Sequence, residues 1–149
     1  MTCASTGKAA VAISGTTIHT ALKISSSRLV PLNSETAQQY RTLFKYIKVT
    51  IVADISRISA QLLLKVDSRL KQITGNFQSN FGGLDIILIG DFRQLPPVGS
   101  TPIYKQPKQT LVGPILWRNL NFYELNEVKR INNFLLYLQK LANHWIKGK

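Results

Sequence analysis

Two short apolar runs constrain the fold of this chain more than any other feature of its sequence. Residues 49–53 have the sequence VTIVA and residues 85–90 have the sequence DIILIG. Continuous apolar runs of this length are typical of strands that are buried on both faces of a parallel sheet. Between them, residues 59–73 carry apolar side chains at helical spacing, and Gly75 can end that helix. The order strand, helix, strand predicts an α/β fold with a parallel sheet covered by helices on both faces.

Weaker patterns predict the other elements. We expect short helices at residues 6–13 and 17–22, and longer helices at residues 35–47 and 134–145. Residues 120–125 are a candidate for a third strand. Together with the two apolar runs, these elements are enough for one domain with a core of its own.

An acidic residue follows each apolar run. Ligands of open α/β sheets bind at the carboxyl ends of the strands, which makes Asp54 and Asp91 the first candidates for a functional site. A strand that ends in an acid is also the second element of P-loop ATPases, where the acid holds magnesium through water. Two plainer interpretations stay open, because Asp54 can cap the next element and Asp91 can belong to a simple turn.

The loop after the second run is more specific. Residues 90–98 have the sequence GDFRQLPPV, and its two prolines hold the backbone extended. Asp91 and Gln94 are therefore presented rigidly at the tip of the strand. A glutamine held at such a place can hydrogen-bond the terminal phosphate of a nucleotide. A proline-stiffened turn would explain the prolines, but it would not explain Asp91 and Gln94 together.

This loop resembles the third motif of Pif-type and RecD-like DNA helicases, whose pattern is Gly-Asp-x-x-Gln-Leu-Pro-Pro-Val. Residues 6–10 (TGKAA) and 15–19 (GTTIH) are similar to the family's blocks that face single-stranded DNA. Residues 125–130 (LNEVKR) resemble the segment whose arginine reaches the terminal phosphate. The resemblance covers most of residues 2–130. It implies the first motor domain of an ATP-dependent 5′-to-3′ DNA helicase with roles in DNA repair, recombination, and genome and telomere maintenance.

The resemblance also assigns roles to individual residues. It implies that Asp54 activates the attacking water, that Gln94 senses the terminal phosphate and that Arg130 stabilises it. Asp91 would lie beside ATP and its magnesium ion. Five further residues would lie along single-stranded DNA: Thr6, Gly7, Lys8, Thr17 and His19. The implied cofactors are therefore Mg²⁺ and ATP, and the implied partners are single-stranded DNA and ATP.

The chain departs from the family pattern at two motifs. The family has Asp-Glu-Ile-Ser where residues 53–56 have ADIS, so Ala53 offers no oxygen to a metal-bound water. Asp54 stands at the position of the catalytic glutamate and is one methylene shorter. A phosphate-binding P-loop ends in Gly-Lys-Ser/Thr, but here Ala9 follows Gly7 and Lys8, and no strand is predicted before them.

We therefore predict an incomplete RecA-like sheet that lacks the first strand and the P-loop of the P-loop NTPase fold. Residues 1–130 would form a partial helicase motor domain, and residues 131–149 a truncated C-terminal helical segment. The chain alone is expected to be inactive. The alternative is a non-enzymatic basic fragment that binds single-stranded nucleic acid, or a decayed helicase copy derived from a transposon.

The charge of the chain favours a nucleic-acid partner. Its 19 Lys and Arg against 7 Asp and Glu give a net charge of +12, which attracts polyanions, although a solvated basic surface stays an alternative.

Cys3 is the only cysteine, which excludes an internal disulfide and a Cys-based metal site. No apolar stretch is long enough for a membrane span. The first 34 residues lack acids, as mitochondrial transit peptides do, but the DNA-facing block explains them, and we expect an intracellular protein that is nuclear rather than mitochondrial.

Overall fold

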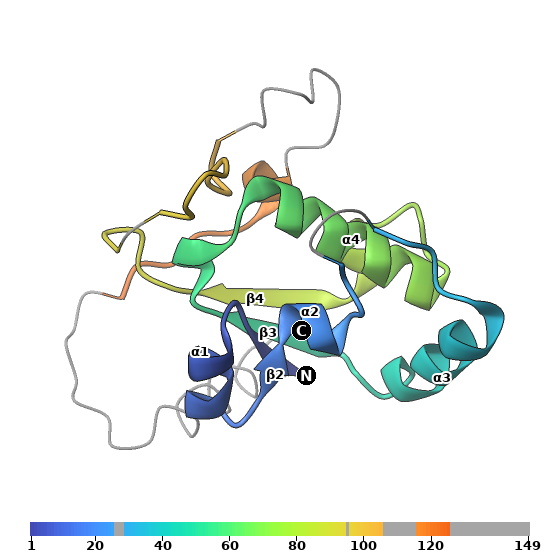
Figure 1. Cartoon of the computed structure of the whole chain (residues 1–149). Helices are drawn as coiled ribbons and strands as arrows, with labels where there is room; N and C mark the ends of the chain where they lie inside the picture. Colours follow the sequence, from blue (N-terminus) through green and yellow to red (C-terminus); the bar gives the residue numbers. More distant parts are fainter. Residues whose placement is uncertain (26–28, 95, 106–115, 126–149) are drawn as a thin grey trace.

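The computed structural model describes residues 1–25, 29–94, 96–105 and 116–125. Its strands are β1 (Thr2–Ala4), β2 (Thr16–Thr17), β3 (Val49–Ala53) and β4 (Asp85–Ile89). Its α-helices are α1 (Gly7–Ala12), α2 (Ile18–Ala21), α3 (Ser34–Phe44) and α4 (Ala60–Thr74). Short 3₁₀ helices are η1 (Ile55–Arg57), η2 (Asn80–Gly83) and η3 (Leu116–Asn119). The strands are all parallel and lie in the order β2-β1-β3-β4 (Figure 1).

The inner strand β3 has helices on both of its faces. Val49, Ile51 and Ala53 pack in one apolar cluster with α1, whereas Val52 packs in a second cluster with α2, α3 and α4. Every residue of β3 is buried, as its apolar sequence predicts. The prediction of an α/β fold with a parallel sheet covered on both faces is confirmed.

Strand β4 is less buried than its sequence predicts. All of its residues are only partly buried, because β4 pairs with β3 along one edge and no other described strand pairs with it. Its side chains still alternate: Ile86 and Leu88 join the cluster of α4, and Ile87 and Ile89 join the cluster of α1. The predicted position and direction of this strand are confirmed, but the prediction that it is completely buried was wrong.

Two expectations about secondary structure need correction. A strand does precede Gly7, because residues 2–4 form β1 between β2 and β3. Residues 120–125 form no strand, and irregular chain follows the short helix η3 there. The helix predicted at residues 134–145 lies outside the described residues, as does Arg130. The remaining helices are confirmed within a few residues at each end.

Helix α4 is set by local signals at both ends. The Ser59 hydroxyl accepts a hydrogen bond from the backbone N–H of Leu62 at 3.1 Å, which caps the amino end. Gly75 follows the last turn with φ of 74°, a left-handed conformation that suits glycine. In the part of the chain that the structure describes, no helix combines the length and the apolar character that crossing a bilayer requires.

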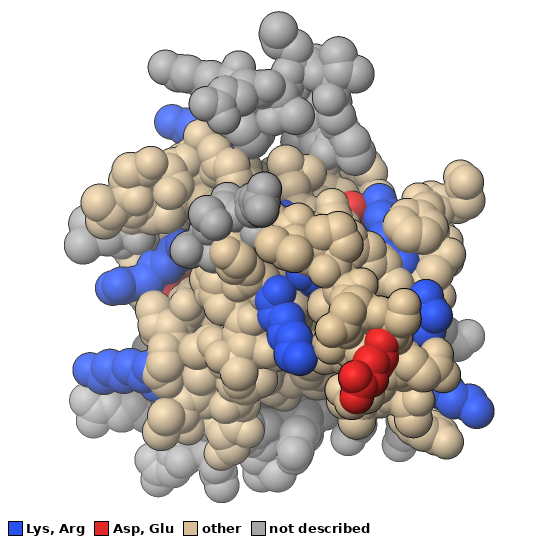
Figure 2. Space-filling view, turned by 45° about the vertical axis from the view of Figure 1, so that its right-hand side comes forward, with Lys and Arg blue, Asp and Glu red and all other residues tan. Residues whose placement is uncertain are grey.

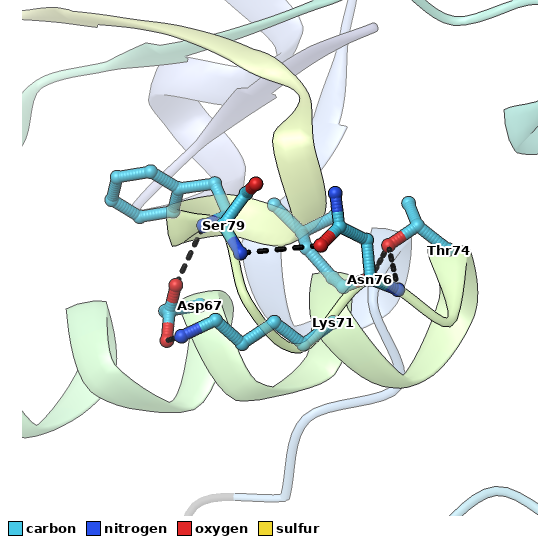
Figure 3. A network of polar contacts seen from close by, with 7 residues as sticks. Asp67, Lys71, Thr74, Asn76 and Ser79 are labelled. Carbon is cyan, nitrogen blue, oxygen red and sulfur yellow. Dashed lines mark hydrogen bonds and ion pairs between the residues drawn. The ribbon is translucent and has the colours of Figure 1, made fainter.

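A polar network ties the segment between α4 and β4 back onto α4 (Figure 3). The buried Asp67 carboxylate accepts a hydrogen bond from the backbone N–H of Phe81 at 2.6 Å and pairs with Lys71 Nζ at 2.8 Å. Further along, the backbone N–H of Ser79 donates to Asn76 Oδ1 at 3.2 Å. These bonds satisfy backbone groups of an irregular segment and hold it against α4 just before β4 begins.

Candidate nucleotide and DNA site

The carboxyl ends of β3 and β4 meet at one edge of the sheet. Ala53 pairs with Ile89, the last residue of β4. The residues that come next, Asp54 and Gly90, therefore leave the two strands at neighbouring positions. Gly90 packs directly on η1, since a β-carbon added to it would lie only 2.8 Å from the backbone nitrogen of Ile55. This close approach, which only glycine permits, brings the chain before Asp91 against the turn after Asp54.

Replacing Gly90 with alanine is expected to destabilise the fold. The new methyl group would meet both the backbone nitrogen and the side chain of Ile55 at 2.8 Å, and overpacking of this kind typically costs about 1–3 kcal/mol. Denaturant unfolding measures the change in the free energy of unfolding. Gly7→Ala is the matched control, because nothing lies within 4 Å of a β-carbon there. Equal stability of the two variants would contradict the close approach of β4 to η1.

Asp54 has an unusual backbone conformation. Its φ of 55° and ψ of 65° lie in the left-handed region, which non-glycine residues seldom adopt. Its carboxylate accepts a hydrogen bond from the Ser56 hydroxyl and lies 3.8 Å from Arg57 Nε. It caps no backbone N–H of η1, so the capping interpretation is not supported. The Asp54 side chain is 26% exposed, which leaves a held carboxylate within reach of solvent.

The residues beside Asp54 do not fit a magnesium ion. Nucleotide sites hold Mg²⁺ through one or two carboxylates together with phosphates. Here the Asp54 carboxylate is engaged by Ser56 and Arg57, and the neighbouring position is Ala53, whose methyl group is buried against the α1 cluster. Among the described residues, no three His, Cys, Asp or Glu side chains form a group that could hold a metal ion.

The loop after β4 begins with a tight turn. Asp91 Oδ1 accepts a hydrogen bond from the backbone N–H of Arg93 at 2.9 Å, and the backbone N–H of Gln94 donates to the Asp91 backbone oxygen at 3.0 Å. The simple-turn interpretation of Asp91 is therefore supported, because its carboxylate has a local partner. Gln94 is exposed and lies in the loop that follows β4 at the same sheet edge.

Phe92 anchors this loop, although no motif pointed to it. Its ring centroid lies 5.6 Å from that of Tyr104 and 5.3 Å from that of Trp117, with the ring planes nearly perpendicular in both pairs. Edge-to-face pairs of this kind contribute about 0.5–1.5 kcal/mol each beyond the burial of their area. The only sequence signal for this role is an aromatic residue between polar ones in an otherwise exposed loop.

The residues assigned to DNA gather around the starts of α1 and α2. They are Thr6, Gly7, Lys8, Thr17 and His19. Because β1 and β2 are paired and a helix follows each of them, the group lies at the same carboxyl edge as Asp54. The hydroxyls of Thr6 and Thr17 accept hydrogen bonds from the backbone N–H three residues later, at 3.3 and 3.2 Å. Both threonines thus cap their helices, Gly7 and Lys8 are exposed, and His19 is half-buried.

Basic side chains are dispersed over the face of the molecule that Figure 2 shows. Figure 2 shows Lys and Arg side chains spread over one face of the molecule, with few acidic atoms among them. A dispersed surplus of this kind attracts polyanions without selecting a base sequence. The net charge of +12 therefore supports general attraction, while a specific DNA path depends on the residues around α1 and α2.

Relatives of the chain are DNA helicases. A family model described as PIF1-like helicase matches residues 1–143. The chain is 38% identical over 101 residues to the ATP-dependent DNA helicase RRM3 of Saccharomyces cerevisiae, which covers 65% of this chain and 14% of that protein. It is 32% identical over 148 residues to the ATP-dependent DNA helicase PIF1 of Xenopus laevis, which covers 93% of this chain and 22% of that protein.

Solved structures agree with these relatives. The crystal structure of Bacteroides Pif1 bound to single-stranded DNA is 27% identical, with a TM-score of 0.59 over 67% of this chain and 24% of that one. The Bacteroides Pif1 complex with ADP-AlF3 and single-stranded DNA is 28% identical with the same TM-score of 0.59. This chain thus spans less than a quarter of the length of these relatives. Its sequence matches the family model over nearly its whole length and its parallel sheet matches theirs, so the chain belongs to the PIF1-like helicase family.

Proposed function

We propose that this chain is the DNA-facing part of the first motor domain of an ATP-dependent 5′-to-3′ DNA helicase. Residues 1–130 would be the partial motor domain, and residues 131–149 a helical segment after it. The names of its relatives, ATP-dependent DNA helicases, support this assignment. Roles in DNA repair, recombination and telomere maintenance, and a nuclear location, belong to the same proposal.

One observation carries the DNA-binding half of this proposal. Two short helices begin side by side at the carboxyl ends of β1 and β2, and all five residues that the motifs assign to DNA lie around their starts. Lys8 is exposed there and can pair with a phosphate. A similar Bacteroides Pif1 has been solved with single-stranded DNA bound.

For the nucleotide half, we propose that a helicase of this kind uses ATP with Mg²⁺, although the residues beside Asp54 in this chain do not fit the ion. Asp54 would activate water, Asp91 would lie beside the nucleotide, Gln94 would sense its terminal phosphate and Arg130 would stabilise that phosphate. The first three lie just after β3 and β4 at one sheet edge, which supports the grouping. Because Ala53 offers no oxygen, this chain by itself would bind DNA without hydrolysing ATP.

The chain is expected to bind single-stranded DNA weakly and without sequence preference. Each phosphate that it neutralises releases counterions, so the affinity should fall steeply as salt rises. Fluorescence anisotropy with labelled oligonucleotides of different sequence, at low and at physiological salt, measures both properties. An affinity that is independent of salt, or a strong preference for one sequence, would contradict the proposal.

A matched pair of lysine variants locates this binding. Lys8→Met is expected to reduce the slope of log affinity against log salt by about one, as loss of one phosphate contact does. Lys48→Met removes the same charge from an exposed residue just before β3, at the opposite edge of the sheet. It should change the slope much less. Equal effects of the two variants would show that the charge acts only as a diffuse field.

The departure of residues 53–56 from the family's magnesium-binding motif also favours a second function. With Ala53 in place of an acid and Asp54 bound to Ser56, the chain can be a basic fragment that binds single-stranded nucleic acid and has no part in a motor. Translating the DNA upstream of the Met1 codon distinguishes the two functions. A Gly-x-x-x-x-Gly-Lys-Thr loop in frame would support a motor, and its absence would support the fragment.

A further inference from the structure

Among the described residues, Arg69 has the largest side chain that is fully buried, with 1% of its surface exposed. Its Nη2 donates to the backbone oxygens of Lys23 at 3.0 Å and Val30 at 2.7 Å, and its Nη1 donates to Gln72 Oε1 at 2.7 Å. None of the described carboxylates pairs with it. Its Nε is buried and has no hydrogen-bond partner.

Packing alone does not account for this side chain. A buried cation without a counter-charge is unfavourable, and an apolar side chain of similar volume is often as stable or more so. Burial lowers the pKa of the Arg69 guanidinium from its ordinary value, an effect that nearby Tyr40 opposes. What Arg69 supplies, and an apolar residue cannot, is a pair of hydrogen bonds to backbone oxygens of distant segments.

One of those oxygens belongs to the turn that closes α2. Lys23 follows Leu22, the residue that caps this helix, and has a φ of 46°; its backbone N–H donates to the Thr20 oxygen at 3.4 Å. The next residue, Ile24, donates its backbone N–H to the His19 oxygen at 3.0 Å. Helix α2 has only four residues, far too few to be stable alone. Its position therefore depends on its packing in the core, where Ile18 is buried, and on what holds its ends, and Arg69 holds one of them.

We propose that Arg69 is a positioning residue for DNA binding. Through the backbone oxygen of Lys23 it holds the turn after α2, and so it places Thr17 and His19 relative to α4. This inference rests on the proposed function of α1 and α2 in binding single-stranded DNA. Since α4 begins shortly after Asp54 and η1, one helix then connects the candidate nucleotide edge with the DNA-facing helix.

Two variants of Arg69 and one control test the proposal in the whole 149-residue chain. Arg69→Met keeps the size of the side chain and removes its donors, while Arg69→Lys keeps a charged donor. Arg41→Met removes the same charge from an exposed arginine of α3. Hydrogen exchange at the Ile24 amide reports on the turn after α2, and anisotropy reports the affinity for single-stranded DNA.

In Arg69→Met, exchange at Ile24 is expected to rise roughly tenfold or more, the scale set by losing hydrogen bonds from a charged group. Amides of β3 should keep their protection, and Arg69→Lys should restore part of the protection at Ile24. The affinity for single-stranded DNA should fall clearly more in Arg69→Met than in Arg41→Met.

Three results would overturn the proposal. They are unchanged exchange at Ile24, equal loss of protection in β3, which would make Arg69 a support of the whole fold, and equal DNA affinities of Arg69→Met and Arg41→Met. A wild-type chain that binds no single-stranded DNA would instead refute the proposed function. Exchange at Ile24 would in that case still decide whether Arg69 holds α2.

Discussion

In the presence of single-stranded DNA, the purified chain is expected to hydrolyse ATP no faster than the uncatalysed background. Phosphoryl transfer depends almost entirely on positioning and on neutralising charge. The chain's Gly7-Lys8 pair lies in the first turn of α1 and is followed by Ala9, so it is no phosphate-binding loop. Ala53 offers no oxygen to a magnesium-bound water. The Asp54 carboxylate is engaged by Ser56, and general-base catalysis is worth ~10²–10⁴-fold when the base is placed correctly.

Phosphate release with and without single-stranded DNA measures this expectation, and Asp54→Ala is its control. Turnover that survives in Asp54→Ala comes from a contaminating enzyme, because the residue proposed to activate water has been removed. DNA-stimulated turnover that disappears in Asp54→Ala would show a working site. In that case the interpretation of Ala53 as a disabling substitution would be wrong.

The parts of the fold that could be predicted from the sequence depend on local signals. The β-branched run of residues 49–53 predicts β3 by itself, and Ser59 and Gly75 mark the ends of α4 within a residue. Strand β1 has only three residues, and its place in the sheet comes from pairing with β2 and β3. No pattern within three residues can reveal pairing with distant strands, which is why the strand before Gly7 was missed.

The candidate site also has features that local sequence signals predict and features that only distant contacts determine. Strand ends were enough to place Asp54 and Asp91 at one sheet edge, whereas the position of the DNA-facing residues at that edge comes from the pairing of β1 and β2. The left-handed conformation of Asp54 could not be predicted, because it depends on Ser56 and on the packing of Gly90 against η1. The burial of Arg69 was equally hidden, since its backbone partners are 46 and 39 positions away in the sequence.

Replacing Gly82 with alanine is expected to be severely destabilising. A β-carbon there would lie 2.3 Å from Thr74 Oγ1 and 2.7 Å from the Leu70 backbone oxygen, and the φ of Gly82 is 66°. A left-handed conformation costs a non-glycine residue about 1–2 kcal/mol, and overpacking adds about 1–3 kcal/mol. Since typical domains have about 5–15 kcal/mol in all, this one methyl group can remove a large part of the stability.

Gly75→Ala separates the two causes, and urea unfolding measures both variants. Gly75 has a similar φ of 74°, but nothing lies within 4 Å of a β-carbon there, so this variant should lose only the conformational part, about 1–2 kcal/mol. Adding Thr74→Ala to Gly82→Ala removes the nearest contact and should recover part of the loss. The clash with Leu70 would remain, because its oxygen belongs to the backbone of α4 and cannot move aside. If Gly82→Ala is no less stable than Gly75→Ala, the segment before β4 does not pack on α4 as closely as described.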